Sequence, residues 1–306
     1  MLIKKISDIS RSKKVCVSIG IFDGVHLGHQ KILKKLVKVT KELDAKSLVI
    51  TFYPHPRKVL DPDITIPFLT SIEHKKNIIE KIGIDYFLAL KFTKGLARMD
   101  AVQFIEHILL KHFNLKGMVV GKDFLFGNKK KGDFSLLKKI GKSCSFIVYG
   151  IDDVKKNKRY VSSTRIRKLI EKGTLKDAEI LLGRKVTVFG TVVKGRRVGR
   201  DLGFPTANIN PHHESIPPSG VYAVDVLLNK SLYRGVLNIG TRPTFMKDIE
   251  PTIELHILDF KKNVYGKDVE IMFIKKLRNE LRFKNAEALK TQIKKDISHA
   301  KQTPYI

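Results

Sequence analysis

The chain has 306 residues, about twice the usual size of one domain, so we expect two domains that each bury their own core. Its 59 Lys and Arg against 30 Asp and Glu give a formal charge of +29, which attracts any polyanion and does not by itself distinguish a nucleotide from a nucleic acid. The composition excludes a membrane-spanning protein, because no apolar run approaches ~18 residues, and also a disulfide framework, because there are only two cysteines.

The first residues, MLIKKISDIS, contain lysines but no apolar core of signal-peptide length, so we expect a cytoplasmic protein. Cys16 and Cys144 each lie in an apolar, strand-like run. We therefore expect both thiols to be buried.

Up to about residue 150, short β-branched runs alternate with amphipathic segments, as a parallel sheet built from βαβ units requires. A helix is expected at 100–113, with Asp100 as its N-cap. The first half is therefore predicted to be a doubly wound, Rossmann-like α/β domain. Its strands are expected at 15–20, 47–52, 85–90, 118–121 and 145–150.

After the helical segment that begins near Ser162, the pattern changes to short strands separated by Gly, Pro and Asn, which predicts an antiparallel barrel or sandwich. A segment without Gly or Pro, 285–302, is expected to close this domain as a helix. We place the domains at residues 1–182 and 183–306. The strands of the second are expected at 186–195, 220–229, 233–240, 252–260 and 269–274.

The segment 20–29 joins the first predicted strand to the first helix, at the sheet edge where α/β folds bind ligands. A helix N-terminus offers unpaired N–H groups, and Gly28 lets the backbone approach a phosphate closely. His26 and His29 can reach the same phosphate chain. The segment therefore predicts a nucleoside triphosphate site, and the alternative is a Gly-rich turn with two exposed histidines. A metal site is disfavoured because no Cys or third His lies at ligand spacing.

This segment resembles the phosphate-binding motif of the nucleotidylyltransferase superfamily, and in detail it is similar to bacterial FAD synthetases. Segments 51–56, 121–127 and 162–167 resemble further motifs of that family, in the same order. The resemblance implies that His26 and His29 take part in catalysis. It implies that ATP phosphates are bound by Gly20, Phe22, Asp23, Gly24, Gly28, Ser162, Ser163, Thr164 and Arg167. It implies a flavin site formed by His55, Pro56, Asp123, Phe124 and Phe126.

The implied chemistry suits these residues, because the phosphate of FMN is already ionised. Its attack on the α-phosphate of ATP needs alignment and charge neutralisation rather than a strong base. For the two phenylalanines, core packing is an equal alternative, and Ser or Thr at a helix start is also a common N-cap. Leu125 and Lys130 depart from the family pattern, which has arginines there, and lysine lacks the bidentate fork of arginine.

In the second half, a Gly- and Arg-rich loop precedes Pro205-Thr206-Ala207-Asn208 and can wrap phosphates. In an extended segment Thr206 and Asn208 project a hydroxyl and an amide oxygen to one face, and these are ligands that Mg²⁺ accepts. By itself the tetrapeptide is equally consistent with a turn cap.

This loop resembles the riboflavin kinase family, together with segments 218–222, 235–245, 253–256 and 265–266 in that family's order, although Lys194 stands where the family has histidine. The resemblance implies phosphate binding by Gly195, Gly199 and Arg200, Mg²⁺ binding by Thr206 and Asn208, and flavin binding by Arg278 and Phe283.

Glu254 is the candidate general base of this second site. It alternates with Ile253, Leu255 and Ile257 in a predicted strand, so it lies on the opposite face, beside His256. A carboxylate there can accept the proton of a ribityl hydroxyl as the γ-phosphoryl group is transferred. The alternative is a solvent-facing strand glutamate. For His256, a supporting role and simple exposure both stay open.

Together the two motif sets predict a bifunctional enzyme that uses Mg²⁺, makes FMN from riboflavin and ATP in the second domain, and makes FAD from FMN and a second ATP in the first. One alternative is that only one activity is retained; another is a basic nucleic-acid-binding protein, although aromatic residues are not interleaved with the basic ones. A class I tRNA synthetase is disfavoured because no anticodon-binding region is evident. We expect small-molecule partners, no membrane, no specific nucleic acid, and a monomer or weak homo-oligomer.

Overall fold

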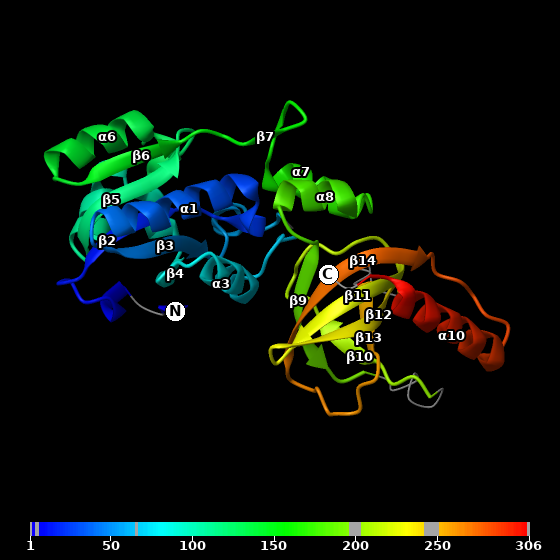
Figure 1. Ribbon diagram of the computed structural model, residues 1–306. Coiled ribbons are helices and arrows are strands. Elements are labelled where there is room, and N and C mark those ends of the chain that lie inside the picture. Colours follow the sequence, from blue (N-terminus) through cyan, green and yellow to red (C-terminus); the bar gives the residue numbers. More distant parts are fainter. Residues whose placement is uncertain (1, 4–5, 65–66, 196–202, 242–250, 305–306) are drawn as a thin grey trace. The chain divides into compact units, whose positions relative to one another are not determined.

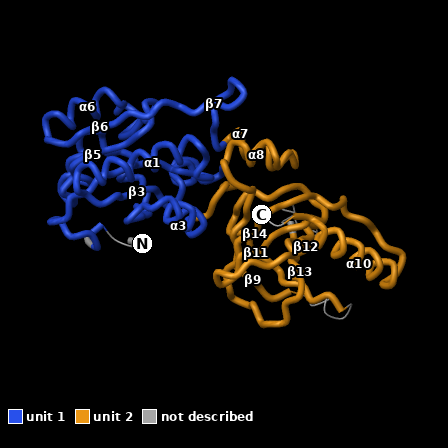
Figure 2. The backbone as a smooth tube through the Cα atoms, in the orientation of Figure 1, with its two compact units in different colours: residues 1–66, 72–163 blue, residues 67–71, 164–306 orange. Residues whose placement is uncertain are grey.

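The computed structural model describes residues 2–3, 6–64, 67–195, 203–241 and 251–304. The chain divides into two compact units, residues 1–66 with 72–163 and residues 67–71 with 164–306 (Figure 2). The first is the predicted α/β domain with a parallel sheet, and the second is the predicted antiparallel barrel with a C-terminal helix (Figure 1).

The first unit is built on a six-stranded parallel sheet with the order β1-β4-β3-β2-β5-β6. All five predicted strands are confirmed, and β1 was not predicted. Because β2 pairs with β3 on one side and with β5 on the other, the chain reverses its direction of winding beside β2. The strands are β1 (Leu2–Ile3), β2 (Lys14–Ile19), β3 (Lys46–Tyr53), β4 (Tyr86–Lys91), β5 (Asn114–Gly121) and β6 (Ile147–Ile151).

Both faces of this sheet are buried, as is usual for parallel sheets. Val15 and Val17 of β2 point into one apolar cluster, whereas Cys16 points into the other. Helices α1 and α3 cover the face of Cys16, and α5, η3 and α6 cover the opposite face. A small hairpin of β7 (Lys155–Lys156) and β8 (Arg159–Tyr160) also belongs to this unit. The helices of this unit are η1 (Ile6–Asp8), η2 (Asp23–Val25), α1 (Leu27–Glu42), α2 (Pro56–Leu60), α3 (Ile72–Lys81), α4 (Lys94–Arg98), α5 (Ala101–Phe104), the π-helical η3 (Ile105–Leu110), η4 (Asn128–Lys130) and α6 (Phe134–Ser143).

The predicted helix at 100–113 is confirmed as α5 and η3, and Asp100 is its N-cap in a reciprocal capping box with Gln103. Cys16 is buried as predicted, and burial raises the pKa of its thiol to about 11. The prediction that Cys144 is buried is wrong, because its side chain is exposed. Cys144 is the C-cap of α6 and β6 begins only at Ile147, so this part of the apolar run forms a turn.

The second unit contains a closed barrel with the strand order β10-β13-β12-β11-β14-β9, in which every pair is antiparallel. The predicted closing helix is confirmed as α10, with Asn285 as its N-cap. The compact units divide after residue 163, so α7 and α8 group with the barrel. The boundary predicted from the sequence between the two functional domains, 182/183, stays a prediction. The elements are α7 (Ser163–Glu171), α8 (Leu175–Leu182), β9 (Thr187–Val193), β10 (Ala207–Asn210), β11 (Gly220–Leu228), β12 (Ser231–Thr241), β13 (Pro251–Ile257), β14 (Asp268–Arg278) and α10 (Ala286–Gln302).

A buried arginine attaches the end of α10 to the barrel. Arg234 of β12 pairs with Asp225 of β11 at 2.8 Å between Nε and Oδ1, and the two side chains are 3% and 0% exposed. The guanidinium also donates hydrogen bonds to the carbonyl oxygens of Ala300, Thr303 and Pro304. One cation therefore pairs with a buried carboxylate and binds carbonyls in the last turn of α10 and just after it.

We predict that Arg234→Ala lowers the free energy of unfolding of the barrel by about 3–5 kcal/mol, because Asp225 loses its buried cation. Urea unfolding followed by circular dichroism measures the change. Lys301→Ala is the matched control, since it removes only an exposed ion pair with Asp259 and should cost less than about 1 kcal/mol. Equal effects of the two substitutions would contradict this account.

Candidate active sites

Three of the predicted site segments meet at one edge of the parallel sheet. They follow the carboxyl ends of β2, β3 and β5, which are neighbours in the sheet. The loop after β2 also lies where the winding direction reverses, and this is the usual ligand site of open α/β sheets. The fold therefore places the first predicted site at the sheet edge where open α/β folds usually bind ligands.

The loop between β2 and α1 has an unusual backbone. Phe22, Gly24 and Val25 have φ values of 50°, 77° and 39°, which residues other than glycine rarely adopt. The Phe22 side chain is only 2% exposed and packs in the apolar cluster under the loop. A Cβ on Gly20 would lie 3.1 Å from the Phe22 ring, so glycine gives this ring room. The Phe22 side chain thus anchors the loop in the apolar core.

His26 and His29 come together at the start of α1. Their rings stack with centroids 3.6 Å apart and an interplanar angle of 17°. His26 is the N-cap, and its Nδ1 accepts a hydrogen bond from the His29 N–H at 3.4 Å. A Cβ on Gly28 would lie 3.1 Å from Cε1 of His26, so glycine also makes room for this ring. His26 is 6% exposed, which excludes the alternative of two freely exposed histidines.

The surroundings of His29 disfavour its protonated form. Burial, followed by the charges of His26 and Lys75, lowers the pKa of His29 well below its ordinary value. Its Nδ1 is buried and accepts or donates no hydrogen bond within the part of the chain that the structure describes. His29 is half-buried, so part of its ring at the helix N-terminus is open to a ligand.

Ser163, in the segment 162–167, makes a hydrogen bond to this loop. The Ser163 hydroxyl donates to the backbone carbonyl of Asp23 at 2.8 Å, and the Asp23 side chain is 3% exposed. Ser162 precedes α7, whereas Thr164 and Arg167 lie in its first turns. The contact joins the first and last of the predicted nucleotide motifs.

Phe124 and Phe126 differ in their surroundings, although their rings stack at 5.3 Å. Phe126 is 7% exposed and packs in the core with Phe104, whereas Phe124 is half-buried. Asp123 is exposed, and Leu125 is 50% exposed. Of the two phenylalanines, Phe124 is thus the one with a surface that a ligand can reach.

His55 and Pro56 follow β3 at the same sheet edge. The His55 side chain caps α2 by accepting the Arg57 N–H at 3.2 Å, and Pro56 is the first residue of that helix. Both residues are half-buried. They follow the strand next to β2, at the sheet edge that also carries the loop before α1.

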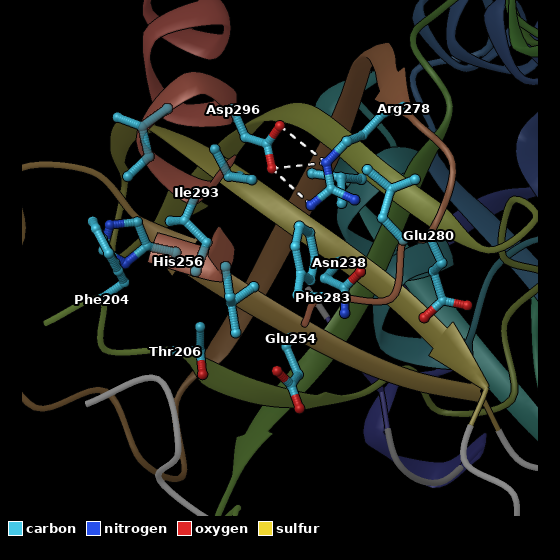
Figure 3. A pocket seen from close by; sticks show the side chains of 15 residues that line it. Phe204, Thr206, Asn238, Glu254, His256, Arg278, Glu280, Phe283, Ile293 and Asp296 are labelled. Carbon is cyan, nitrogen blue, oxygen red and sulfur yellow. Dashed lines mark hydrogen bonds and ion pairs between the residues drawn. The ribbon is translucent and has the colours of Figure 1, made fainter. Parts of the chain in front are cut away.

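The second site is a cavity of about 290 Å³ in the barrel unit, between the barrel and α10 (Figure 3). Its walls are mainly apolar, with a few polar groups that converge on it, as in typical small-molecule sites. Four of the residues predicted from the sequence line it: Thr206, Glu254, Arg278 and Phe283.

Glu254 lies in a row of polar residues across three strands. It pairs in register with Asn208 of β10 on one side and with Asn238 of β12 on the other. Directly paired residues of antiparallel strands project to the same side of the sheet. The predicted alternation is confirmed, because Ile253 and Leu255 are 3% and 1% exposed while Glu254 lines the cavity. Glu254 is therefore no simple surface glutamate.

Asn238, which also lines the cavity, was not predicted. Two signals for it are present in the sequence: it is a polar residue inside the apolar run 236–239, and it lies in the segment 235–245, which resembles the riboflavin kinase family. His256, whose role the sequence left open, has a structural partner: its Nδ1 donates to the Pro205 carbonyl at 2.8 Å. This bond holds the chain directly before Thr206.

Arg278 and Asp296 connect the barrel to α10 inside the cavity. The Arg278 guanidinium donates two bonds from Nε to the Asp296 carboxylate, at 3.1 and 3.0 Å, and one from Nη2 at 2.8 Å (Figure 3). Its guanidinium carbon lies 5.8 Å from the centre of the Phe283 ring. Sequence reasoning found Arg278 and Phe283 but missed Asp296, which orients the Arg278 guanidinium.

The donor set around Thr206 and Asn208 fits a hard cation. Thr206 lines the cavity with Glu254, and Asn208 is the cross-strand neighbour of Glu254. A Cβ on Gly195 would overlap the Asn208 amide, so the backbone of the preceding loop passes directly against it. Gly199 and Arg200 lie outside the described residues. Hydroxyl, amide and carboxylate oxygens are the ligands that Mg²⁺ takes together with phosphate.

Comparisons with known proteins match each half of the chain to one family. A family model described as FAD synthetase matches residues 8–165, and one described as riboflavin kinase matches residues 182–303. The bifunctional riboflavin kinase/FMN adenylyltransferase of Buchnera aphidicola subsp. Schizaphis graminum is 39% identical over 98% of both chains. That of Escherichia coli K12 is 37% identical over 96% of this chain and 95% of its own.

A crystal structure described as a macrolide-efflux protein from Streptococcus pneumoniae is also similar, with a TM-score of 0.84 and 29% identity over 99% of both chains. Its description names a transport process. In the described residues of this chain, no helix combines the length and the apolar character needed to cross a membrane.

We predict that the His29 ring stays neutral from about pH 6 to 8, because burial and the nearby cation oppose its protonation. NMR titration of the ring C–H signals, with His29→Gln for assignment, measures this. Below pH ~6.5 the unfolded chain binds a proton that the folded state excludes, so the free energy of unfolding should fall as the pH drops. An inflection of the His29 signal near pH 6.5 would contradict the prediction.

Proposed function

The chain belongs to the bifunctional riboflavin kinase/FMN adenylyltransferase family, and from this premise we propose which of its residues perform each reaction. With ATP it phosphorylates riboflavin to FMN, and with a second ATP it converts FMN to FAD and pyrophosphate. The assignment of one reaction to each half of the chain rests on two separate sets of candidate residues, one in each half. Because both regions match, neither an enzyme with a single retained activity nor a nucleic-acid-binding protein is favoured.

In the kinase reaction, Glu254 acts as the general base. The ribityl hydroxyl of riboflavin attacks the γ-phosphorus of ATP, its proton passes to the Glu254 carboxylate, and ADP leaves. The position of Glu254 inside a largely apolar cavity supports this role, because a flavin ring needs an apolar wall and its hydroxyl needs an acceptor. Arg278 and Phe283 contribute to the wall that contacts the flavin.

The phosphate groups of this ATP need positive charge and donors beside Glu254. Thr206 and Asn208 would hold Mg²⁺, and the ion, when bound, neutralises charge on the triphosphate. The backbone around Gly195, with Gly199 and Arg200, is proposed to wrap the phosphates. The tight approach of Gly195 to Asn208 supports that placement.

In the adenylyl transfer, an oxygen of the FMN phosphate attacks the α-phosphorus of ATP and pyrophosphate leaves, so no proton has to be removed. His26, His29 and the N-terminus of α1 bind the phosphates. Gly20, Asp23, Gly24 and Gly28 shape this loop, and Ser162, Ser163, Thr164 and Arg167 add donors. The flavin of FMN is proposed to lie against Phe124, near Asp123, His55 and Pro56.

We further propose a cytoplasmic location, a monomer or weak homo-oligomer, and no specific nucleic-acid partner. The supporting argument is that every residue assigned a role here serves a small, water-soluble substrate. Mg²⁺ is proposed for both reactions, since each transfers a phosphoryl or adenylyl group from a triphosphate.

We predict that Glu254→Gln lowers FMN formation from riboflavin by about 10²-fold or more, because the amide cannot accept the hydroxyl proton. Conversion of supplied FMN to FAD should continue unchanged. Chromatography of the flavins over time, in the presence of ATP and Mg²⁺, measures both steps. Glu287→Gln, at an exposed position of α10, is the matched control and should leave both steps intact.

The reverse pattern is expected for His29→Ala. Loss of a preorganised donor should slow FAD formation by about 10²-fold, while FMN formation from riboflavin persists. His107→Ala, at an exposed position of the same unit, serves as the control. Loss of both steps in either active-site variant would count against two separate sites.

A further inference from the structure

A buried lysine holds the backbone of the loop between β2 and α1. Lys75 of α3 is 4% exposed, and its Nζ donates to the backbone carbonyl of Ile21 at 2.6 Å. The same oxygen accepts the hydroxyl of Thr51, at the end of β3, at 3.1 Å. One carbonyl of the loop is thus fixed by two side chains from two different elements.

Packing alone does not account for a lysine at this position. Ile78 and Ile79, one turn further along α3, are buried in the apolar cluster on that face of the sheet. Lys75 stands on the same helical face, where an apolar residue would fill the space without the cost of desolvating an ammonium. Its charge therefore has a role other than filling the core.

The anchored carbonyl stands directly before the strained part of the loop. Phe22, the next residue, has a φ of 50°, and the chain then runs through Gly24 and Val25 to the two stacked histidines. Such a backbone persists only where its surroundings fix it. A hydrogen bond from a charged donor is about twice as strong as a neutral one. The ammonium of Lys75 is the charged donor at this point.

We propose that Lys75 is a positioning residue for adenylyl transfer: through the Ile21 carbonyl it holds the loop that places His26 and His29 against the phosphates of ATP. The inference rests on the proposed function of this loop. Lys75 acts through the backbone rather than on the substrate, because its side chain is almost wholly covered. Its charge also acts on His29, which helps to keep that imidazole neutral.

The test compares Lys75→Met with two further variants of the full-length enzyme. Lys75→Met keeps the length of the side chain and removes the ammonium. Thr51→Val removes only the neutral donor to the same carbonyl. Lys76→Met is the matched control, because Lys76 is the neighbouring residue of α3 and pairs with Glu73 near the surface.

Steady-state kinetics with FMN, ATP and Mg²⁺ should show kcat lowered about 10- to 100-fold in Lys75→Met, with KM for FMN within about threefold, because misplaced catalytic groups cost rate in the transition state. Thr51→Val should show a smaller fall, and Lys76→Met none. Each kcat is divided by the fraction of folded protein, which is measured from the intensity of the native His29 ring signal in the NMR spectrum. The His29 pKa should also rise in Lys75→Met, which a role in packing alone would not produce.

Adenylyl transfer within twofold of the unsubstituted enzyme in Lys75→Met would overturn the inference. So would an equal loss of riboflavin kinase activity, since Lys75 would then support the chain as a whole. If His29→Ala abolishes FAD formation and Lys75→Met does not, only the inference about Lys75 fails. If His29→Ala leaves FAD formation intact, the assignment of the reaction to this loop fails as well.

Discussion

Buried cations fix the backbone and helix segments around both sites. A charge removed from water must be compensated by hydrogen bonds or an opposite charge, and this requirement specifies one arrangement of its partners. Lys75 fixes the Ile21 carbonyl, Arg234 fixes Asp225 and the end of α10, and Arg278 fixes Asp296 at the cavity wall. Lys75 and Arg278 act at the two candidate sites, whereas Arg234 anchors the end of α10 to the barrel.

Both reactions require sites whose groups are held in fixed positions. Transfer of a phosphoryl or adenylyl group gains mainly from groups that already stand in place before the substrate arrives. The backbone of Phe22 and Val25 could not keep its left-handed conformation on a mobile loop. The hydrogen bond from Lys75 to the Ile21 carbonyl offsets part of the cost of removing its ammonium from water.

The fold was largely predictable because strands buried on both faces are continuous β-branched runs and strand ends carry Gly and Pro. His26, His29 and Glu254 were singled out because their segments resemble two enzyme families, and the structure places them at a sheet edge and in a cavity; their roles stay predictions. Cys144 was mispredicted because an apolar run does not show where a helix ends. Lys75, Asn238 and Asp296 escaped because their partners, Ile21, Glu254 and Arg278, are distant in sequence. A charged residue on an apolar helix face was the one available signal for Lys75.

The difference between the two sites follows from the two nucleophiles. The hydroxyl of riboflavin must lose a proton as it attacks, so the barrel site needs a carboxylate, and Glu254 stands in the cavity with its neighbours Asn208 and Asn238. The phosphate of FMN is already ionised, and a carboxylate facing it would repel it. The loop at α1 accordingly presents stacked imidazoles and a helix N-terminus, while the Asp23 side chain is buried. The ionisation state of each nucleophile thus accounts for the proposed difference: the barrel site has a candidate base, and the site at α1 has phosphate-binding donors without one.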